Sequence, residues 1–148
     1  MALNLSGGGG NDDIRVISGF NPQRDSTAFP VLLLNSRLDI KLDGEAGSDY
    51  LFTEVIPCIR PSGSLNITMD GGAGDDFVLA TIFVDRMSTV NHNLSCRVNG
   101  GEGNDQVGLL ALGQLGDPNL ASFLIDGGPG IDTVIIALPN VRVRNCER

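Results

Sequence analysis

Apolar and polar residues alternate in the segments that precede the glycine-rich stretches of this chain. In residues 38–42 apolar side chains alternate with aspartate and lysine, and residues 65–69 and 94–98 repeat the alternation. A second apolar segment follows four of the stretches: residues 14–17, 78–84, 109–112 and 134–138. Alternation with a period of two residues is typical of half-buried strands, and the spacing of an amphipathic helix is essentially absent. The pattern therefore predicts an all-β protein.

One eight-residue motif occurs five times along the chain. Its copies begin at Gly7, Gly44, Gly71, Gly100 and Gly127. In every copy positions 1 and 4 are glycine, position 6 is aspartate and position 8 is isoleucine, leucine or valine. Successive copies start 37, 27, 29 and 27 residues apart, and we assign the longer first interval to an inserted loop at residues 19–30. We number positions 1–6 of the five copies as turns 1 to 5.

The repeating unit of strand, glycine turn, strand and looser bend cannot bury its own apolar face, so neighbouring units must stack. The sequence therefore predicts a single domain over residues 1–148, folded as a right-handed parallel β-solenoid similar to a β-roll or β-helix. It would contain about five coils of 27–29 residues, each with one glycine-rich turn. A β-sandwich is the competing fold, but it has no reason to repeat one turn sequence at near-constant spacing.

Glycines and acidic residues are concentrated in the same short segments. The chain carries 18 acidic and ten basic residues, a formal net charge of −8, which argues against a nucleic-acid partner. Eight-residue windows that start one residue before each motif copy contain 15 of the 20 glycines, 12 of the 18 acids and none of the bases. No apolar run approaches the length of a membrane span. Any function must therefore account for negative charge gathered into glycine turns.

Stacking would align the aspartates at position 6 in a single row: Asp12, Asp49, Asp76, Asp105 and Asp132. Equivalent residues of adjacent strands lie about 4.8 Å apart, and two carboxylates at that distance repel by roughly 3–4 kcal/mol at an effective dielectric constant of about 20. The turns contain no lysine or arginine, which indicates a bound cation. Carboxylates and backbone carbonyls, without histidine or cysteine, suit Ca²⁺. Glycine permits positive φ angles, which lets carbonyls turn toward an ion.

The motif copies resemble the hemolysin-type calcium-binding repeat, the RTX nonapeptide Gly-Gly-x-Gly-x-Asp-x-U-x, in which U is a large apolar residue. Copies 1, 3, 4 and 5 match every specified position, and copy 2 differs only in Glu45 at position 2. The resemblance implies a parallel β-roll or β-helix, Ca²⁺ between stacked turns, export to calcium-rich surroundings and folding only there. It also implies the ligands, which are the position-6 carboxylate and carbonyls of the glycine stretch. On this chain they correspond to Asp12, Asp49, Asp76, Asp105 and Asp132, with carbonyls near Gly8, Gly10, Gly72, Gly74, Gly101, Gly103, Gly128 and Gly130.

The spacing of the motif departs from that of the family. Family arrays usually repeat about every nine residues and have ion rows on both edges, whereas the last four copies here start 27 to 29 residues apart. We therefore expect one ion row on one edge, and four ions at most because five turns enclose four gaps. Glu45 at position 2 and Ile131 at position 5 make the gaps beside turns 2 and 5 the weaker sites. Turns 3 and 4 should bind best.

These observations predict a non-enzymatic calcium-binding module of an exported protein, secreted or on the cell surface, in which Ca²⁺ drives folding outside the cell. One alternative is a surface- or carbohydrate-binding solenoid that uses residues 19–30 as its contact region. Another is a polysaccharide-modifying enzyme, but such sites need clustered bases or aromatic residues, and the chain has no tryptophan and a single histidine, His92. A third is a metal-free solenoid whose aspartates only shape tight turns.

The ends of the sequence carry further expectations. No cleavable signal peptide is visible. Solenoid ends need polar caps, which Arg142, Arg144 and Arg148 would supply at the last coil. The first coil shows no such cap, so we expect a fragment of a longer polypeptide that can associate end to end.

The three cysteines do not form a disulfide scaffold, because an odd number cannot all pair. Cys96 falls at an inward position of its strand and is predicted to be a buried thiol that packs as a small apolar side chain. Pairing of Cys58 with Cys146 is left open by the sequence.

Overall fold

The structure is a computed structural model that describes residues 1–18, 31–33, 36–59, 63–84, 93–113, 115, 120–137 and 140–147, with the backbone alone at residues 31–33 and 58. These ranges consist of strands, turns and bends, so the predicted all-β class is confirmed for the described part of the chain. They contain no helix long and apolar enough to cross a membrane. The loop predicted at residues 19–30, His92 and Arg148 lie outside the described residues.

Two large parallel sheets make up most of the fold. The larger sheet has the order β1 (Ala2–Gly9), β4 (Arg37–Ala46), β7 (Ser64–Ala73), β9 (Asn93–Glu102), β11 (Ala121–Asp126) and β13 (Arg142–Arg144). The second sheet has the order β12 (Thr133–Ala137), β10 (Gln106–Gly113), β8 (Phe77–Val84), β5 (Tyr50–Val55) and β2 (Asp13–Ser18). A small sheet pairs β3 (Val31–Leu33) with β6 (Pro57–Ile59). We call the two large sheets sheet A and sheet B.

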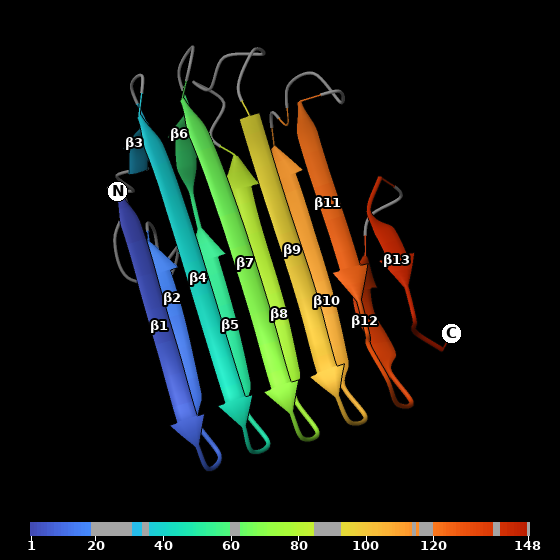
Figure 1. Cartoon of the computed structure of the whole chain (residues 1–148). Coiled ribbons are helices and arrows are strands. Elements are labelled where there is room, and N and C mark those ends of the chain that lie inside the picture. Colours follow the sequence, from blue (N-terminus) through green and yellow to red (C-terminus); the bar gives the residue numbers. More distant parts are fainter. Residues whose placement is uncertain are drawn as a thin grey trace, which may run out of the picture.

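The strand register follows the spacing of the motif. In sheet A, Ile40 lies beside Ile67, and Ile67 lies beside Cys96. In sheet B, Leu51 lies beside Val78, and Val78 lies beside Val107. Sheet A lies in front of sheet B in Figure 1, and the glycine turns join their strands at the lower end of the molecule. Equivalent residues of successive units are therefore side by side.

The hydrophobic core lies between the two sheets. In the central strands of sheet A alternate residues are buried, and Leu42, Met69 and Val98 are fully buried neighbours in register. Sheet B supplies the opposite side of the same core. Cys96 is buried in this core, as its position in the sequence predicted, and burial raises the pKa of its thiol. The alternation read from the sequence is thus the alternation between core and surface.

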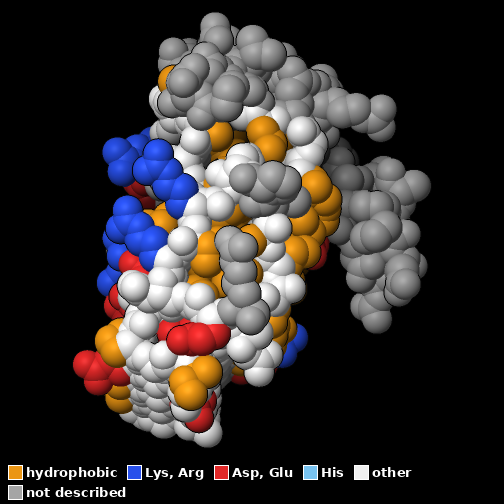
Figure 2. Space-filling model, turned by 90° about the vertical axis from the view of Figure 1, so that its right-hand side faces the viewer, with side chains coloured by type: hydrophobic (Ala, Val, Ile, Leu, Met, Phe, Trp, Pro, Cys, Tyr) orange, Lys and Arg blue, Asp and Glu red, His pale blue; other side chains and the backbone are white. Residues whose placement is uncertain are grey.

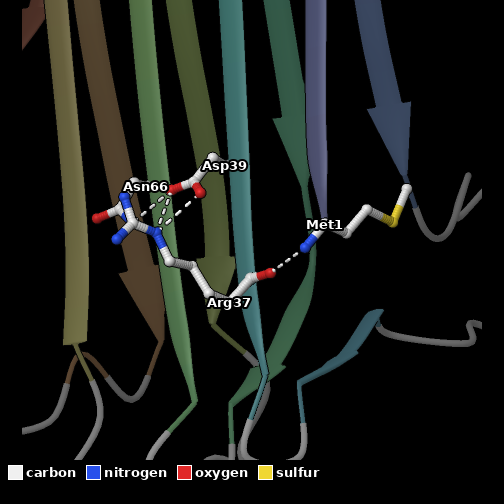
Figure 3. Close-up of polar contacts among 4 residues, drawn as sticks. All are labelled: Met1, Arg37, Asp39 and Asn66. Atoms are coloured by element: carbon white, nitrogen blue, oxygen red, sulfur yellow. Dashed lines mark hydrogen bonds and ion pairs between the residues drawn. The ribbon is translucent and has the colours of Figure 1, made fainter.

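The outer surface of sheet A is polar. Arg37 Nε donates to Asp39 Oδ1 at 2.7 Å, Asn66 Nδ2 donates to the same oxygen at 2.8 Å, and the Met1 ammonium group donates to the Arg37 carbonyl at 2.8 Å (Figure 3). Lys41 forms a second exposed ion pair with Asp43 at 2.7 Å. Exposed ion pairs of this kind contribute little to stability, so this surface chiefly keeps the outward side of the sheet soluble.

The outer surface of sheet B is more apolar and aromatic. Tyr50 and Phe77 are neighbours in register, and their rings stack with centroids 4.8 Å apart and an angle of 3° between the planes. The Arg15 guanidinium lies 4.8 Å from the centroid of the Tyr50 ring. Figure 2 shows the basic side chains gathered along one side of the molecule and mostly backbone atoms at its lower end, where the glycine turns lie. The chemistry of the turns is therefore mainly that of backbone groups and the aspartates.

Candidate metal site at the glycine turns

The five position-6 aspartates lie in one continuous row across the glycine turns, which we call the aspartate row. In each case the backbone N–H of one aspartate donates to Oδ1 of the aspartate in the next turn. The N···Oδ1 distances are 2.7 Å from Asp12 to Asp49, 2.7 Å from Asp49 to Asp76, 2.8 Å from Asp76 to Asp105 and 2.9 Å from Asp105 to Asp132. Direct hydrogen bonds therefore place a positive amide dipole between successive carboxylates.

A second set of turn-to-turn hydrogen bonds runs through position 5. Ser48 N donates to Asn11 Oδ1 at 2.9 Å, and Asn104 N donates to Asp75 Oδ1 at 2.9 Å. Ile131 N donates to Asn104 Oδ1 at 3.0 Å, so the apolar residue at position 5 of turn 5 still donates through its backbone. The polar residues of the turns thus hold the stack together through backbone amides, which the motif alone does not reveal.

The second carboxylate oxygen of each aspartate in the row is buried without a hydrogen-bond partner among the described residues. This holds for Oδ2 of Asp12, Asp49, Asp76, Asp105 and Asp132. Four of these residues are nearly inaccessible, with exposed fractions from 3 % at Asp49 to 0 % at Asp132. A buried carboxylate oxygen without a partner costs free energy. Five such atoms in one row therefore mark positions where a positive ligand would be stabilised.

A backbone carbonyl lies close to each unpartnered Oδ2 atom. A Cβ built on Gly71 would lie 2.2 Å from the Gly100 carbonyl oxygen and 2.4 Å from Asp76 Oδ2. A Cβ on Gly100 would lie 2.4 Å from the Gly127 carbonyl oxygen and 2.3 Å from Asp105 Oδ2. Two hard oxygens thus converge beside each position-1 glycine, and lack of space explains why that position is glycine. These position-1 carbonyls were absent from the ligand set that the resemblance implied.

The glycines at positions 2 and 4 are required by backbone conformation. Their φ angles are positive, as at Gly72 (103°) and Gly74 (139°). The remaining predicted carbonyl donors have the same conformation: Gly8, Gly10, Gly101, Gly103, Gly128 and Gly130. Their carbonyls point along the stack, because the Gly72 oxygen lies 1.9 Å from where a Cβ of residue 101 would be. The contacts therefore place the position-1 carbonyl beside Oδ2, whereas the carbonyls of positions 2 and 4 abut the backbone of the next turn.

Turn 2 contains the one non-glycine residue at position 2. Glu45 has a φ of 72°, in the region that favours glycine. Its carbonyl oxygen lies 2.1 Å from where a Cβ of Gly72 would be, so turns 2 and 3 are packed as closely as their neighbours. The side chain accepts a hydrogen bond from Ser6 Oγ at the surface. The expected crowding at Glu45 is therefore present as backbone strain, of order 1–3 kcal/mol for such a conformation.

Burial changes the acidity of the central carboxylates. It raises the pKa of Asp76 to about 6, with a smaller upward contribution from the carboxylates of Asp105 and Asp49 and a downward one from the backbone hydrogen bond to Asp49. The pKa of Asp105 is also raised, first by burial and then by Asp132 and Asp75. The centre of the aspartate row therefore holds its negative charge at a cost when no cation is bound.

Acidification is expected to stabilise the metal-free protein. The pKa of Asp76 rises from 3.8 to about 6 on folding, so its stabilising contribution is complete below about pH 3.8 and is lost as the pH rises through about 6. Thermal unfolding in chelator should give a higher Tm at pH 5 than at pH 7. Asp76→Asn, which does not titrate, should reduce this difference. A Tm of the wild-type chain that falls between pH 7 and pH 5 would contradict the assignment.

Side chains alone do not complete a metal site in the described part of the chain, because no group of three or more His, Cys, Asp or Glu residues there is arranged to hold an ion. Any cation at the turns would need backbone carbonyls as well. No protein-family model, no curated protein and no solved structure matches this chain. The argument for function therefore depends on the geometry of the turns.

Proposed function

We propose that this chain is a non-enzymatic, calcium-binding structural module of an exported protein. Its fold is a right-handed parallel β-solenoid of about five coils, with Ca²⁺ between successive glycine turns. The proposal is carried by one observation, the row of five buried Oδ2 atoms that have no partner. It is supported by the strand register, because matched residues of successive units pair in both sheets.

The donor set fits calcium by its chemistry. Ca²⁺ accepts six to eight oxygen ligands in irregular geometry, and the turns offer carboxylate and carbonyl oxygens with no nitrogen or sulfur ligand. The Oδ2 atoms of the aspartate row would bind the ion together with neighbouring glycine carbonyls, while Oδ1 keeps its amide partner. The ion would supply the positive charge that the turns lack.

The location follows from the strength expected of such sites. Ligands drawn from loose turns bind Ca²⁺ weakly, with Kd about 10⁻⁴–10⁻³ M as in extracellular modules. A ligand that binds only the folded state stabilises it by RT ln(1 + [L]/Kd). Folding would therefore be favoured outside the cell, where calcium is abundant, and disfavoured inside it. The ions act here as structural links, and no catalytic step is assigned to the chain.

Calcium titration tests the proposal directly. Calorimetry should show binding of up to four ions at the gaps between the five turns, and circular dichroism should show β-structure that appears with Ca²⁺ and disappears with a chelator. Mg²⁺ at the same concentration serves as the control and should act more weakly, because it needs near-ideal octahedral geometry. A chain that is indifferent to both Ca²⁺ and chelator would defeat the proposal.

A further inference from the structure

A sixth, shortened turn follows turn 5. Asp126 pairs with Arg144, and Thr133 forms a parallel bridge with Glu147. Six residues lie between Asp126 and Thr133, whereas two lie between Arg144 and Glu147. Residues 144–147, which we call the shortened turn, therefore make the same passage as a motif copy with four residues fewer. The motif search does not detect this segment because it contains no glycine.

Glu147 takes over the hydrogen bonds that a position-6 aspartate makes elsewhere. Asp132 N donates to Glu147 Oε2 at 2.6 Å, as the other amides of the aspartate row donate to Oδ1. Glu147 N donates to the Asp132 carbonyl at 2.8 Å, which is the bond that Thr133 makes to Asp105. Glutamate stands one residue later than the aspartate would, and its extra methylene group restores the reach. The arginines predicted to cap this end, Arg142 and Arg144, instead lie exposed on β13.

The gap between turn 5 and the shortened turn contains the same pair of converging oxygens as the other gaps. A Cβ on Gly127 would lie 2.0 Å from the Asn145 carbonyl oxygen and 2.6 Å from Asp132 Oδ2. Asp132 is fully buried, and its Oδ2 atom has no hydrogen-bond partner in the described structure. An unpartnered, fully buried carboxylate oxygen that points beside a carbonyl indicates a cation ligand.

This gap also has more room than the others. In turns 2 to 5 the glycines at positions 2 and 4 press against the preceding turn, with the Gly74 oxygen 2.0 Å from the position of a Cβ on Gly103. The shortened turn has no residues at positions 2 to 5, so the carbonyls of Gly128 and Gly130 have no such turn after them. Gly130 is exposed accordingly. An ion could enter here without separating two stacked backbones.

We propose a further Ca²⁺ site in this gap, held by the carboxylates of Asp132 and Glu147 and the carbonyl of Asn145. The carbonyls of Gly128 and Gly130 and water complete the ligand set. The proposal rests on the proposed function and raises the upper bound from four ions to five. Because its ligands come from a non-motif segment, the site belongs to this chain's own sequence and does not follow from the repeat.

Counting bound ions by native mass spectrometry tests the site. Glu147→Gln keeps the side-chain length and an oxygen that can accept the Asp132 N–H, but it removes the charge. Glu102→Gln is the matched control, because Glu102 is exposed at position 3 of turn 4. At saturating Ca²⁺ the wild-type chain and Glu102→Gln should bind equal numbers, and Glu147→Gln should bind one ion fewer.

The outcomes separate this site from the proposed function. A wild-type chain that binds Ca²⁺, together with an unchanged count in Glu147→Gln, would overturn the further site alone. A wild-type chain that binds no Ca²⁺ would overturn both proposals. If Glu147→Gln does not fold, amide resonances of the wild-type chain decide instead. Those of Asp132 and Glu147 should shift during the titration, and unmoved resonances at saturation would overturn the site.

Discussion

Replacing Gly101 with alanine is expected to lower the free energy of unfolding by about 3 kcal/mol or more, or to prevent folding. The new Cβ would lie 1.9 Å from the Gly72 carbonyl oxygen and 2.8 Å from the Gly72 carbonyl carbon and nitrogen. These are backbone atoms fixed in the β7–β9 pairing, so neither partner can move aside without breaking the ladder. Residue 101 also has a φ of 114°, which adds strain for any side chain. Thermal or urea unfolding in chelator measures the loss.

Gly8→Ala is the matched control for Gly101→Ala. Gly8 occupies position 2 of turn 1 with a φ of 92°, but a Cβ there meets nothing within 4 Å. It should therefore cost only the conformational strain, about 1 kcal/mol. The difference between the two variants isolates the contact between stacked turns. Equal losses in Gly8→Ala and Gly101→Ala would show that the turns do not approach as closely as described.

The parallel sheets could be predicted from the sequence because two independent patterns agree. Alternation of apolar residues defines which face of a strand is buried, and the motif spacing defines which residues become neighbours. Leu42, Met69 and Val98 follow from both patterns, and the structure buries them side by side. The aligned row of aspartates follows from the same register. A pattern in the sequence was sufficient wherever the same side chain recurs at a fixed offset.

The hydrogen bonding of the turns could not be predicted in this way. The sequence argument compared charged side chains with one another and left out the backbone amide that Asp105 accepts from Asp76. It also explained the glycines by φ alone, whereas Gly71 at position 1 is required by the space that Asp76 Oδ2 and a carbonyl occupy. Glu147 escaped detection because the shortened turn conserves the hydrogen bonds of the motif without any of its residues.

The two oxygens of each aspartate therefore have different tasks. Oδ1 accepts an amide and links one turn to the next whether or not metal is present. Oδ2 is buried without a partner, and its environment improves only when a cation or a proton arrives. This separation reconciles the metal-free explanation of the aspartates with the calcium explanation, since the conserved acid at position 6 serves both. It also allows the two tasks to be separated experimentally.

Asp105→Asn and Asp105→Ala are expected to differ in chelator and to agree in calcium. Asparagine retains an oxygen that can accept the Asp76 N–H, so the free energy of unfolding without metal should stay within about 1 kcal/mol of wild type. Alanine leaves that buried amide without an acceptor and should cost about 2–3 kcal/mol. Neither variant has the Oδ2 carboxylate oxygen, so both should gain less stability than wild type on addition of Ca²⁺. Unfolding curves with chelator and with saturating Ca²⁺ measure both effects.

Asp43→Asn controls for the loss of one negative charge near the turns. Asp43 lies on the outer surface of sheet A and pairs with Lys41, outside the aspartate row. It should gain as much stability from Ca²⁺ as the wild-type chain does. If Asp105→Asn also gained that full amount, Oδ2 would not be a calcium ligand. If Asp105→Asn instead lost as much stability in chelator as Asp105→Ala, the link between turns would depend on the charge of the carboxylate and not on the Oδ1 acceptor, since a neutral oxygen would then fail to hold the amide of Asp76.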